Sequence, residues 1–174
     1  MTTTVPLLNE MDRAAFTAVL GHLFEHSPWI PEETWLRRPF CDGSHLLREL
    51  CATMRAAPVE RQRELIEAHP DLAGRLALAG GLTPESAREQ ASAGLNQISA
   101  GELALFQRRN AEYRAKFGFP FIICARLNAR DAILRAMERR MGNTLAEEHA
   151  AALAEIEQIA RLRLDDILKT SEPP

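Results

Sequence analysis

Alanine and leucine together occupy 50 of the 174 positions of this chain, whereas valine occurs only at Val5, Val19 and Val59. Alanine and leucine have high helix propensities, and β-branched residues favour sheets. The choice of apolar residues therefore predicts an all-α fold. A chain of this length can bury roughly 70% of its unfolded surface in one domain. We expect a single compact multi-helix domain over residues 1–174, with its core at about 9–168 and a frayed tail at 169–174.

Helix-capping signals recur along the chain and predict where its helices begin. Ser99 and Glu102 have the spacing of a capping box, in which each side chain satisfies a backbone N–H of the other residue, and Thr144 and Glu147 repeat it. Asn9 is expected to cap a helix that continues to about residue 25. Further helix starts are predicted at Pro31, Ser44, Pro58, Thr83 and Asn128.

Residues 117–125, with the sequence FGFPFIICA, depart from this helical pattern. They combine aromatic and β-branched residues with Pro120 and include no charged side chain. A single strand cannot satisfy its backbone hydrogen bonds, and no partner strand is evident elsewhere in the sequence. We therefore expect a buried extended segment, or the start of a helix, within the helical bundle. Its backbone N–H and C=O groups are then available to line a pocket and contact a ligand.

Charge and apolar patterning argue against several classes of function. The net charge of −3 gives no general attraction to nucleic acid or to an anionic membrane. No stretch approaches the roughly 18 uncharged apolar residues of a membrane span, and the first residues do not resemble a secretory signal. The three cysteines, Cys41, Cys51 and Cys124, form no CxxC pair. This cysteine usage favours a reducing, cytoplasmic location and no cysteine zinc site.

His22, Glu25 and His26 match the HxxEH pattern, in which two histidines one helical turn apart bind zinc. Such a short pattern arises easily by chance in a helix-rich chain, and no third ligand is evident downstream. The helix should also end at Ser27-Pro28. We therefore predict no metal site and interpret these residues as a helix C-terminus, where the helix dipole favours a histidine.

Two other places carry groups suited to proton chemistry. His69 precedes Pro70, and a residue before proline is disfavoured in the helical conformation, so His69 is expected to end its helix and project from an exposed loop. One face of the helix that begins after Thr83 is expected to bring together a hydroxyl, a carboxylate and an amide, from Ser86, Glu89 and Gln90. By spacing alone, a structural histidine and a solvated polar face are the more common interpretations.

Arg161 and Arg163 lie two positions apart in the last predicted helix, about 200° apart around an ideal helix axis. One arginine can therefore face solvent while the other reaches inward. A buried arginine needs an anion, either a carboxylate of the protein or one of a ligand. The spacing leaves both choices open.

Four segments carry a resemblance to a known family: EAHPDL at 67–72, SAREQ at 86–90, NAEYRAKFGFPFIICA at 110–125 and IARLRL at 159–164. Together they resemble the 2-oxo-4-hydroxy-4-carboxy-5-ureidoimidazoline (OHCU) decarboxylases, in matching order from about residue 9 to 168. FEHSPW at 24–29 also fits this family, which uses no metal, and this accounts for the HxxEH pattern.

The resemblance implies an all-helical enzyme of urate breakdown that converts OHCU, a small anionic substrate, to (S)-allantoin without a cofactor. It implies a homodimer, and catalytic roles for His69 and Glu89. Substrate contacts are implied at Pro70, Ser86, Ala87, Arg88, Glu89, Gln90, Phe121, Ile122, Ile123, Cys124, Ala125 and, by alignment in preference to Arg161, Arg163. The alternatives are a non-catalytic helical interaction module and a decarboxylase of a related carboxylated ureido compound.

Overall fold

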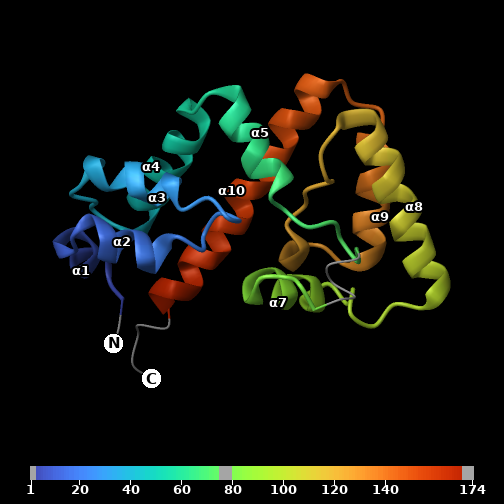
Figure 1. The fold of residues 1–174 in the computed structure, drawn as a ribbon. Helices are drawn as coiled ribbons and strands as arrows, with labels where there is room; N and C mark the ends of the chain where they lie inside the picture. Colours follow the sequence, from blue (N-terminus) through green and yellow to red (C-terminus); the bar gives the residue numbers. More distant parts are fainter. Residues whose placement is uncertain (1–2, 75–79, 170–174) are drawn as a thin grey trace. The chain divides into compact units, whose positions relative to one another are not determined.

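The computed structural model describes residues 3–74 and 80–169 (Figure 1). Helices dominate these residues, which contain no strand, so the predicted all-α class is confirmed. None of the helices described is long and apolar enough to cross a membrane. The helical elements are α1 (Val5–Glu10), α2 (Arg13–Leu20), α3 (Trp29–Thr34), η1 (Trp35–Arg37), α4 (Gly43–Ala56), α5 (Val59–Glu67), α7 (Pro84–Ser92), α8 (Ala100–Phe117), η2 (Ala125–Leu127), α9 (Arg130–Arg140) and α10 (Leu145–Lys169).

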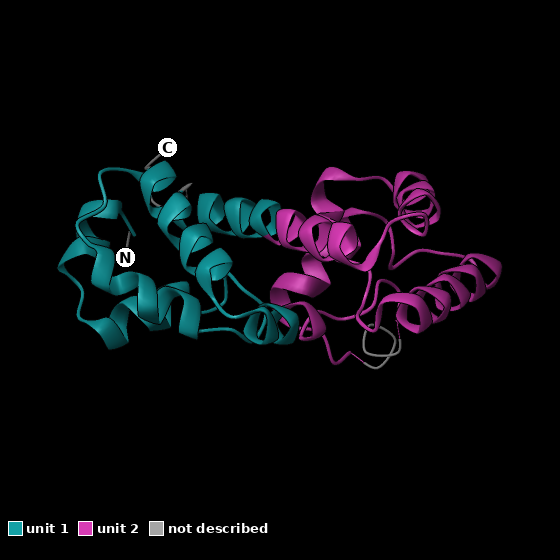
Figure 2. Cartoon of the chain, turned by 90° about the horizontal axis from the view of Figure 1, so that it is seen from above, with its two compact units in different colours: residues 1–65, 157–174 teal, residues 66–156 magenta. Residues whose placement is uncertain are grey.

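Backbone packing divides the chain into two compact units (Figure 2). The first unit comprises residues 1–65 and 157–174, and the second comprises residues 66–156. The two boundaries fall within α5 and α10, so each of these helices contributes to both units. That the whole chain behaves as one domain stays a prediction, and all of the predicted frayed tail except residue 169 lies outside the described residues.

Capping residues start several helices where the sequence predicts them. Thr83 caps α7, and Ser99 forms the predicted capping box with Glu102 at the start of α8. The backbone N–H and hydroxyl of Ser99 donate to the Glu102 carboxylate and lower its pKa. Thr144 and Glu147 make the same reciprocal hydrogen bonds at the start of α10. These starts are predictable because both partners lie within one helical turn.

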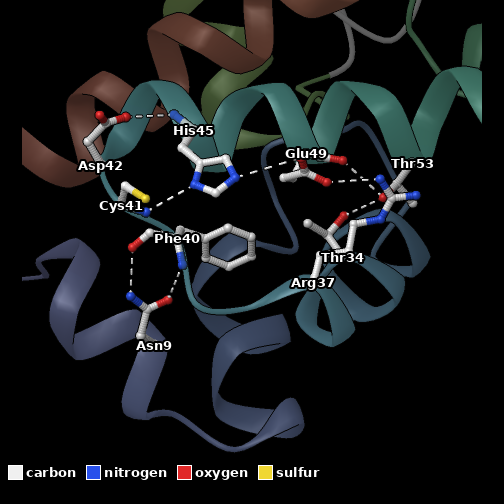
Figure 3. Close-up of polar contacts among 9 residues, drawn as sticks. All are labelled: Asn9, Thr34, Arg37, Phe40, Cys41, Asp42, His45, Glu49 and Thr53. Carbon is white, nitrogen blue, oxygen red and sulfur yellow. Dashed lines mark hydrogen bonds and ion pairs between the residues drawn. The ribbon is translucent and has the colours of Figure 1, made fainter.

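The predicted cap at Asn9 is wrong. Thr4 caps a short helix, α1, and the side chain of Asp12 accepts the Ala15 N–H to cap a second helix, α2. The Asn9 side chain instead makes two hydrogen bonds of 2.9 Å with the backbone N–H and C=O of Phe40 (Figure 3). A break at residues 11–12 therefore replaces the single helix that was predicted to continue to residue 25.

Helix α4 also begins earlier than predicted. Asp42, rather than Ser44, caps this helix by accepting the His45 N–H at 2.7 Å (Figure 3). The His45 ring in turn accepts the backbone N–H of Cys41 through Nδ1, and its Nε2 faces Glu49 at 3.7 Å. The histidine therefore ties the loop before α4 to the first turns of the helix.

The extended segment at residues 119–124 is buried within the second unit, as predicted. Its aromatic rings, together with Phe117 at the end of α8, pack around Tyr113 of α8, which is fully buried. The Tyr113 ring lies 4.6 Å from the Phe117 ring and 5.2 Å from the Phe121 ring, measured between centroids. The Tyr113–Phe121 pair has the edge-to-face geometry that aromatic side chains favour.

A buried ion-pair network lies beside these rings. Glu148 of α10 is 0% exposed and accepts hydrogen bonds from Arg140 Nε at 2.8 Å, Asn143 Nδ2 at 2.7 Å and the Tyr113 hydroxyl. Burial and the hydrogen bond to Glu148 raise the pKa of Tyr113. The Arg140 guanidinium lies 4.4 Å above the Phe121 ring. The network thus joins α8, α9, α10 and the extended segment.

Replacing Glu148 by glutamine tests the energetic weight of this network. We expect Glu148→Gln to lower the free energy of unfolding by about 3–5 kcal/mol, because it leaves the largely buried charge of Arg140 without its counter-ion. Urea denaturation monitored by circular dichroism measures this change. Glu147→Gln is the control, since Glu147 is exposed, and it should change the stability far less. Equal effects of the two substitutions would contradict the assigned role of Glu148.

Candidate active site

His69 lies just beyond the end of α5, in the turn that precedes Pro70. Its backbone N–H donates to the C=O of Ile66 at 3.2 Å, and the chain then leaves the helix. The prediction that His69 ends its helix is confirmed, but the prediction of an exposed loop is wrong. The residue is only 6% exposed and its Nε2 nitrogen is buried. The imidazole is therefore held within the protein, because the following loop packs back against α7 and α8.

Polar side chains anchor this loop, residues 70–74. The Gln90 carboxamide accepts the Ala73 N–H at 3.0 Å and donates to the Asp71 C=O at 3.4 Å. From α8, Arg114 Nε donates to both carboxylate oxygens of Asp71 at 3.0 and 3.1 Å. The position of His69 thus depends on contacts with two helices that lie later in the chain.

A cavity of about 510 Å³ opens beside His69, between the loop and α8. The α8 side is formed by Gln107, Asn110 and Arg114. Asn110 also supports the loop, because its Nδ2 donates to the Leu72 C=O at 2.9 Å. This volume lies in the range of small-molecule sites. Among the described residues, the lining includes His69 and Pro70 but none of Phe121, Ile122, Ile123, Cys124 and Ala125.

The α7 residues divide between two faces. Ser86 and Gln90 are buried and Glu89 is partly buried, which confirms that these three residues share one face of the helix. Ala87 and Arg88 are exposed. The Arg88 guanidinium pairs with Glu85 at 3.2 Å, and its side chain is 75% exposed. The structure therefore groups the hydroxyl, carboxylate and amide and separates them from Arg88.

The negative charge of Glu89 acts on Cys124 of the extended segment. Helix α7 packs against η2, which directly follows Cys124. Burial raises the pKa of the Cys124 thiol, and the negative charges of Glu155 and Glu89 raise it further. A thiol in such surroundings is a poor nucleophile, so Cys124 is suited to packing rather than to covalent chemistry.

Two side chains hold the backbone of the extended segment on either side of Ile123. Arg140 Nη1 donates to the Ile122 C=O at 2.7 Å, and the Cys124 N–H donates to Glu155 Oε2 at 2.8 Å. Ile123 itself is 7% exposed, and within the described part of the chain neither its N–H nor its C=O makes a hydrogen bond. Buried peptide groups are almost always hydrogen-bonded, so this peptide is suited to meeting a ligand.

Arg163 and Arg161, both in the first unit, divide as their spacing predicts. Arg163 is 4% exposed, and both of its terminal nitrogens donate to Glu25 at 3.2 Å. Its Nη1 also donates to the His22 C=O at 3.0 Å. Arg161 is half-exposed and faces Asp165 at 3.7 Å. The anion that the buried Arg163 needs is therefore a carboxylate of the protein, that of Glu25.

The HxxEH residues do not lie on a helix. Helix α2 ends at Leu20, so the interpretation of these residues as a helix C-terminus is wrong. His22 and His26 are exposed, and His26 has a left-handed backbone with φ of 47°. Glu25 is buried against Arg163. The i, i+4 geometry of a helical zinc site does not form here, because the segment turns instead of continuing the helix.

Comparison with known proteins identifies the family. Residues 9–165 match the family model described as OHCU decarboxylase. The chain is 38% identical, over 162 residues, to the 2-oxo-4-hydroxy-4-carboxy-5-ureidoimidazoline decarboxylase of Amia calva, and the match covers 93% of each chain. This chain belongs to the OHCU decarboxylase family.

Two solved structures resemble the OHCU decarboxylase fold of this chain. A crystal structure of (S)-allantoin synthase superposes with a TM-score of 0.73 and 26% identity, over 95% of this chain and 54% of that chain. A crystal structure of OHCU decarboxylase in the presence of (S)-allantoin gives a TM-score of 0.70 at 23% identity, over 91% of this chain and 99% of that chain. The second likeness concerns the fold alone.

Sequence reasoning missed three residues that organise these parts of the OHCU decarboxylase fold. The HxxEH pattern is the signal that the sequence offers at Glu25, and it does not indicate the pairing with Arg163. No motif marks Arg140 or Glu155, although both hold the extended segment. The signal available for Glu155 is its spacing of three and four residues from Ala152 and Ile159, buried positions on the same face of α10, where a carboxylate needs a partner.

The three cysteines should differ in reactivity with a disulfide reagent near pH 8. Cys41 is exposed, whereas burial raises the pKa of Cys51 to about 12 and also raises that of Cys124. Because only the thiolate reacts, we expect one fast thiol in the native protein and three after unfolding. Absorbance of the released thiolate measures both. Cys41→Ser should abolish the fast phase, and a second fast thiol would contradict the assignment.

Proposed function

We propose that this protein decarboxylates OHCU to (S)-allantoin, a step of urate breakdown. The observation that carries the proposal is the family match over residues 9–165. The relative from Amia calva carries the name of this decarboxylase, and the (S)-allantoin synthase structure carries the name of the product. The buried histidine beside a cavity of small-molecule size supports a catalytic site in the second unit.

The reaction breaks the bond between a ring carbon and its carboxylate. Carbon dioxide leaves, and the electron pair of the broken bond is delocalised into the adjacent C=N or carbonyl system of the imidazoline. Because the substrate contains this electron sink, the chemistry requires no cofactor to accept the pair. Protonation of the carbon skeleton on one face then gives the (S) product. The protein must hold the substrate, stabilise the developing charge and deliver one proton.

His69 is the residue that we assign to proton transfer. Histidine titrates near neutral pH and can both accept and donate a proton. The loop contacts made by Gln90 hold the backbone that follows His69, so Gln90 contributes to positioning the imidazole as well as to the α7 face. Orientation of a reacting group in this way accounts for a large part of many rate accelerations.

The remaining implied contacts have distinct chemical tasks in this proposal. Ser86, Glu89 and Gln90 offer hydrogen bonds to the hydroxyl, ring and ureido groups, and the peptide of Ile123 suits a planar amide edge. A substrate contact at Arg163 stays a prediction of the family resemblance, since both terminal nitrogens of this arginine donate to Glu25. Contacts at Ala87 and Arg88 would have to be made from the exposed face of α7.

The test of His69 is its replacement by asparagine, which retains polarity but cannot relay a proton near neutral pH. With freshly generated OHCU, we expect His69→Asn to lower the rate at least about 100-fold and to remove the (S) excess, both followed by circular dichroism. His26→Asn is a matched control at an exposed histidine whose left-handed backbone asparagine tolerates. It should behave like the wild type.

Persistence of fast, stereospecific allantoin formation in His69→Asn would remove His69 from proton transfer. Absence of any acceleration by the wild-type protein would instead contradict the proposed function itself. That result would favour the non-catalytic helical module.

We also infer a cytoplasmic homodimer. The family resemblance supports the dimer, and the free thiols of all three cysteines are compatible with a reducing compartment. Light scattering on the purified protein should give twice the 19.4 kDa mass of the chain. A mass equal to that of one chain, at the concentrations used for assay, would exclude the dimer as the working form.

A further inference from the structure

Two consecutive peptide planes of the extended segment are each held by one side chain. In the plane between residues 122 and 123, the C=O belongs to Ile122 and accepts Arg140 Nη1 at 2.7 Å. In the plane between residues 123 and 124, the N–H belongs to Cys124 and donates to Glu155 Oε2 at 2.8 Å. Both anchors therefore act on the peptide groups that flank the Cα of Ile123.

Because peptide bonds are planar, these two anchors also fix the directions of the Ile123 N–H and C=O. The N–H and C=O of a trans peptide are fixed in one plane and point in opposite directions. The Ile123 N–H therefore points away from Arg140, and the Ile123 C=O points away from Glu155. Within the described residues these two groups make no hydrogen bond. Ile123 thus keeps one donor and one acceptor that no contact among the described residues uses.

The two anchors differ in their surroundings. Arg140 belongs to the buried network with Glu148 and Tyr113, so its substitution would disturb the core. Glu155 is only partly buried, and among the described residues it forms no ion pair. Its hydrogen bond with the Cys124 N–H is charge-assisted and therefore stronger than a bond between neutral groups. Glu155 is the anchor that can be altered with least effect on folding.

We propose that Glu155 is a positioning residue, which acts through the Cys124 N–H to aim the Ile123 C=O at a planar ligand that carries both an N–H and a C=O. An amide or ureido edge has this chemistry. The inference rests on the proposed function, because the ureido-bearing substrate and product supply such edges. Glu155 itself does not touch the ligand in this arrangement.

Three substitutions separate positioning from a general structural role. Glu155→Ala removes the acceptor, and Glu155→Asp keeps the charge but shortens the side chain by one methylene. We expect both to raise KM for OHCU and to weaken (S)-allantoin binding about fivefold, the scale of one hydrogen bond, with a smaller change in kcat. Glu155→Gln should stay near the wild type, since its amide oxygen can accept the same N–H. Steady-state kinetics and calorimetry with (S)-allantoin provide these values.

Glu138→Ala is the control, because Glu138 lies on α9 with its side chain 71% exposed. Unchanged KM and (S)-allantoin affinity in Glu155→Ala and Glu155→Asp would overturn the inference. So would a loss in Glu155→Gln as large as that in Glu155→Ala, since the charge rather than the acceptor would then matter. A fall in kcat alone would indicate lost active protein and would also overturn it. An inactive wild type would contradict the proposed function instead.

Discussion

The buried ion pair between Arg140 and Glu148 is the interaction on which the second unit depends. A carboxylate with no exposure is costly unless it is paired and hydrogen-bonded, and Glu148 meets this condition through Arg140, Asn143 and Tyr113. An apolar replacement of similar volume can equal such a pair in stability. It cannot, however, donate a directed hydrogen bond to the Ile122 C=O. The network therefore fixes the orientation of the Ile122 C=O relative to the helices that pack around it.

The parts of the fold that sequence predicts well are those whose partners lie within a few residues. The capping boxes at Ser99 and Thr144 are examples, because each is complete within one turn of helix. At the amino-terminal end, Asn9 and Asp12 are both suitable caps by composition. The choice between them is made by Phe40, whose backbone binds the Asn9 side chain from 31 positions away. No local pattern contains that information.

The candidate site shows the same division. Pro70 is enough to predict that His69 leaves its helix, because the constraint acts on the adjacent residue. The burial of His69 depends on a loop that Gln90 holds through backbone hydrogen bonds, and only the fold brings these together. The sequence does not indicate the partner of Arg163 for the same reason, since Glu25 lies 138 positions away. Charge and spacing predict the need for a partner but not its identity.

The distribution of charge around the extended segment bears on how a substrate would lie there. Burial raises the pKa of the Cys124 thiol, and the negative charges of Glu155 and Glu89 raise it further, so both carboxylates act on this end of the extended segment. A further carboxylate, such as that of OHCU, is disfavoured beside these two, whereas N–H donors are favoured. Under the proposed function, the neutral ureido and ring edges would face Glu89 and the Ile123 peptide. The carboxylate that is lost would then point away from them, which removes the repulsion expected if Glu89 faced the scissile group.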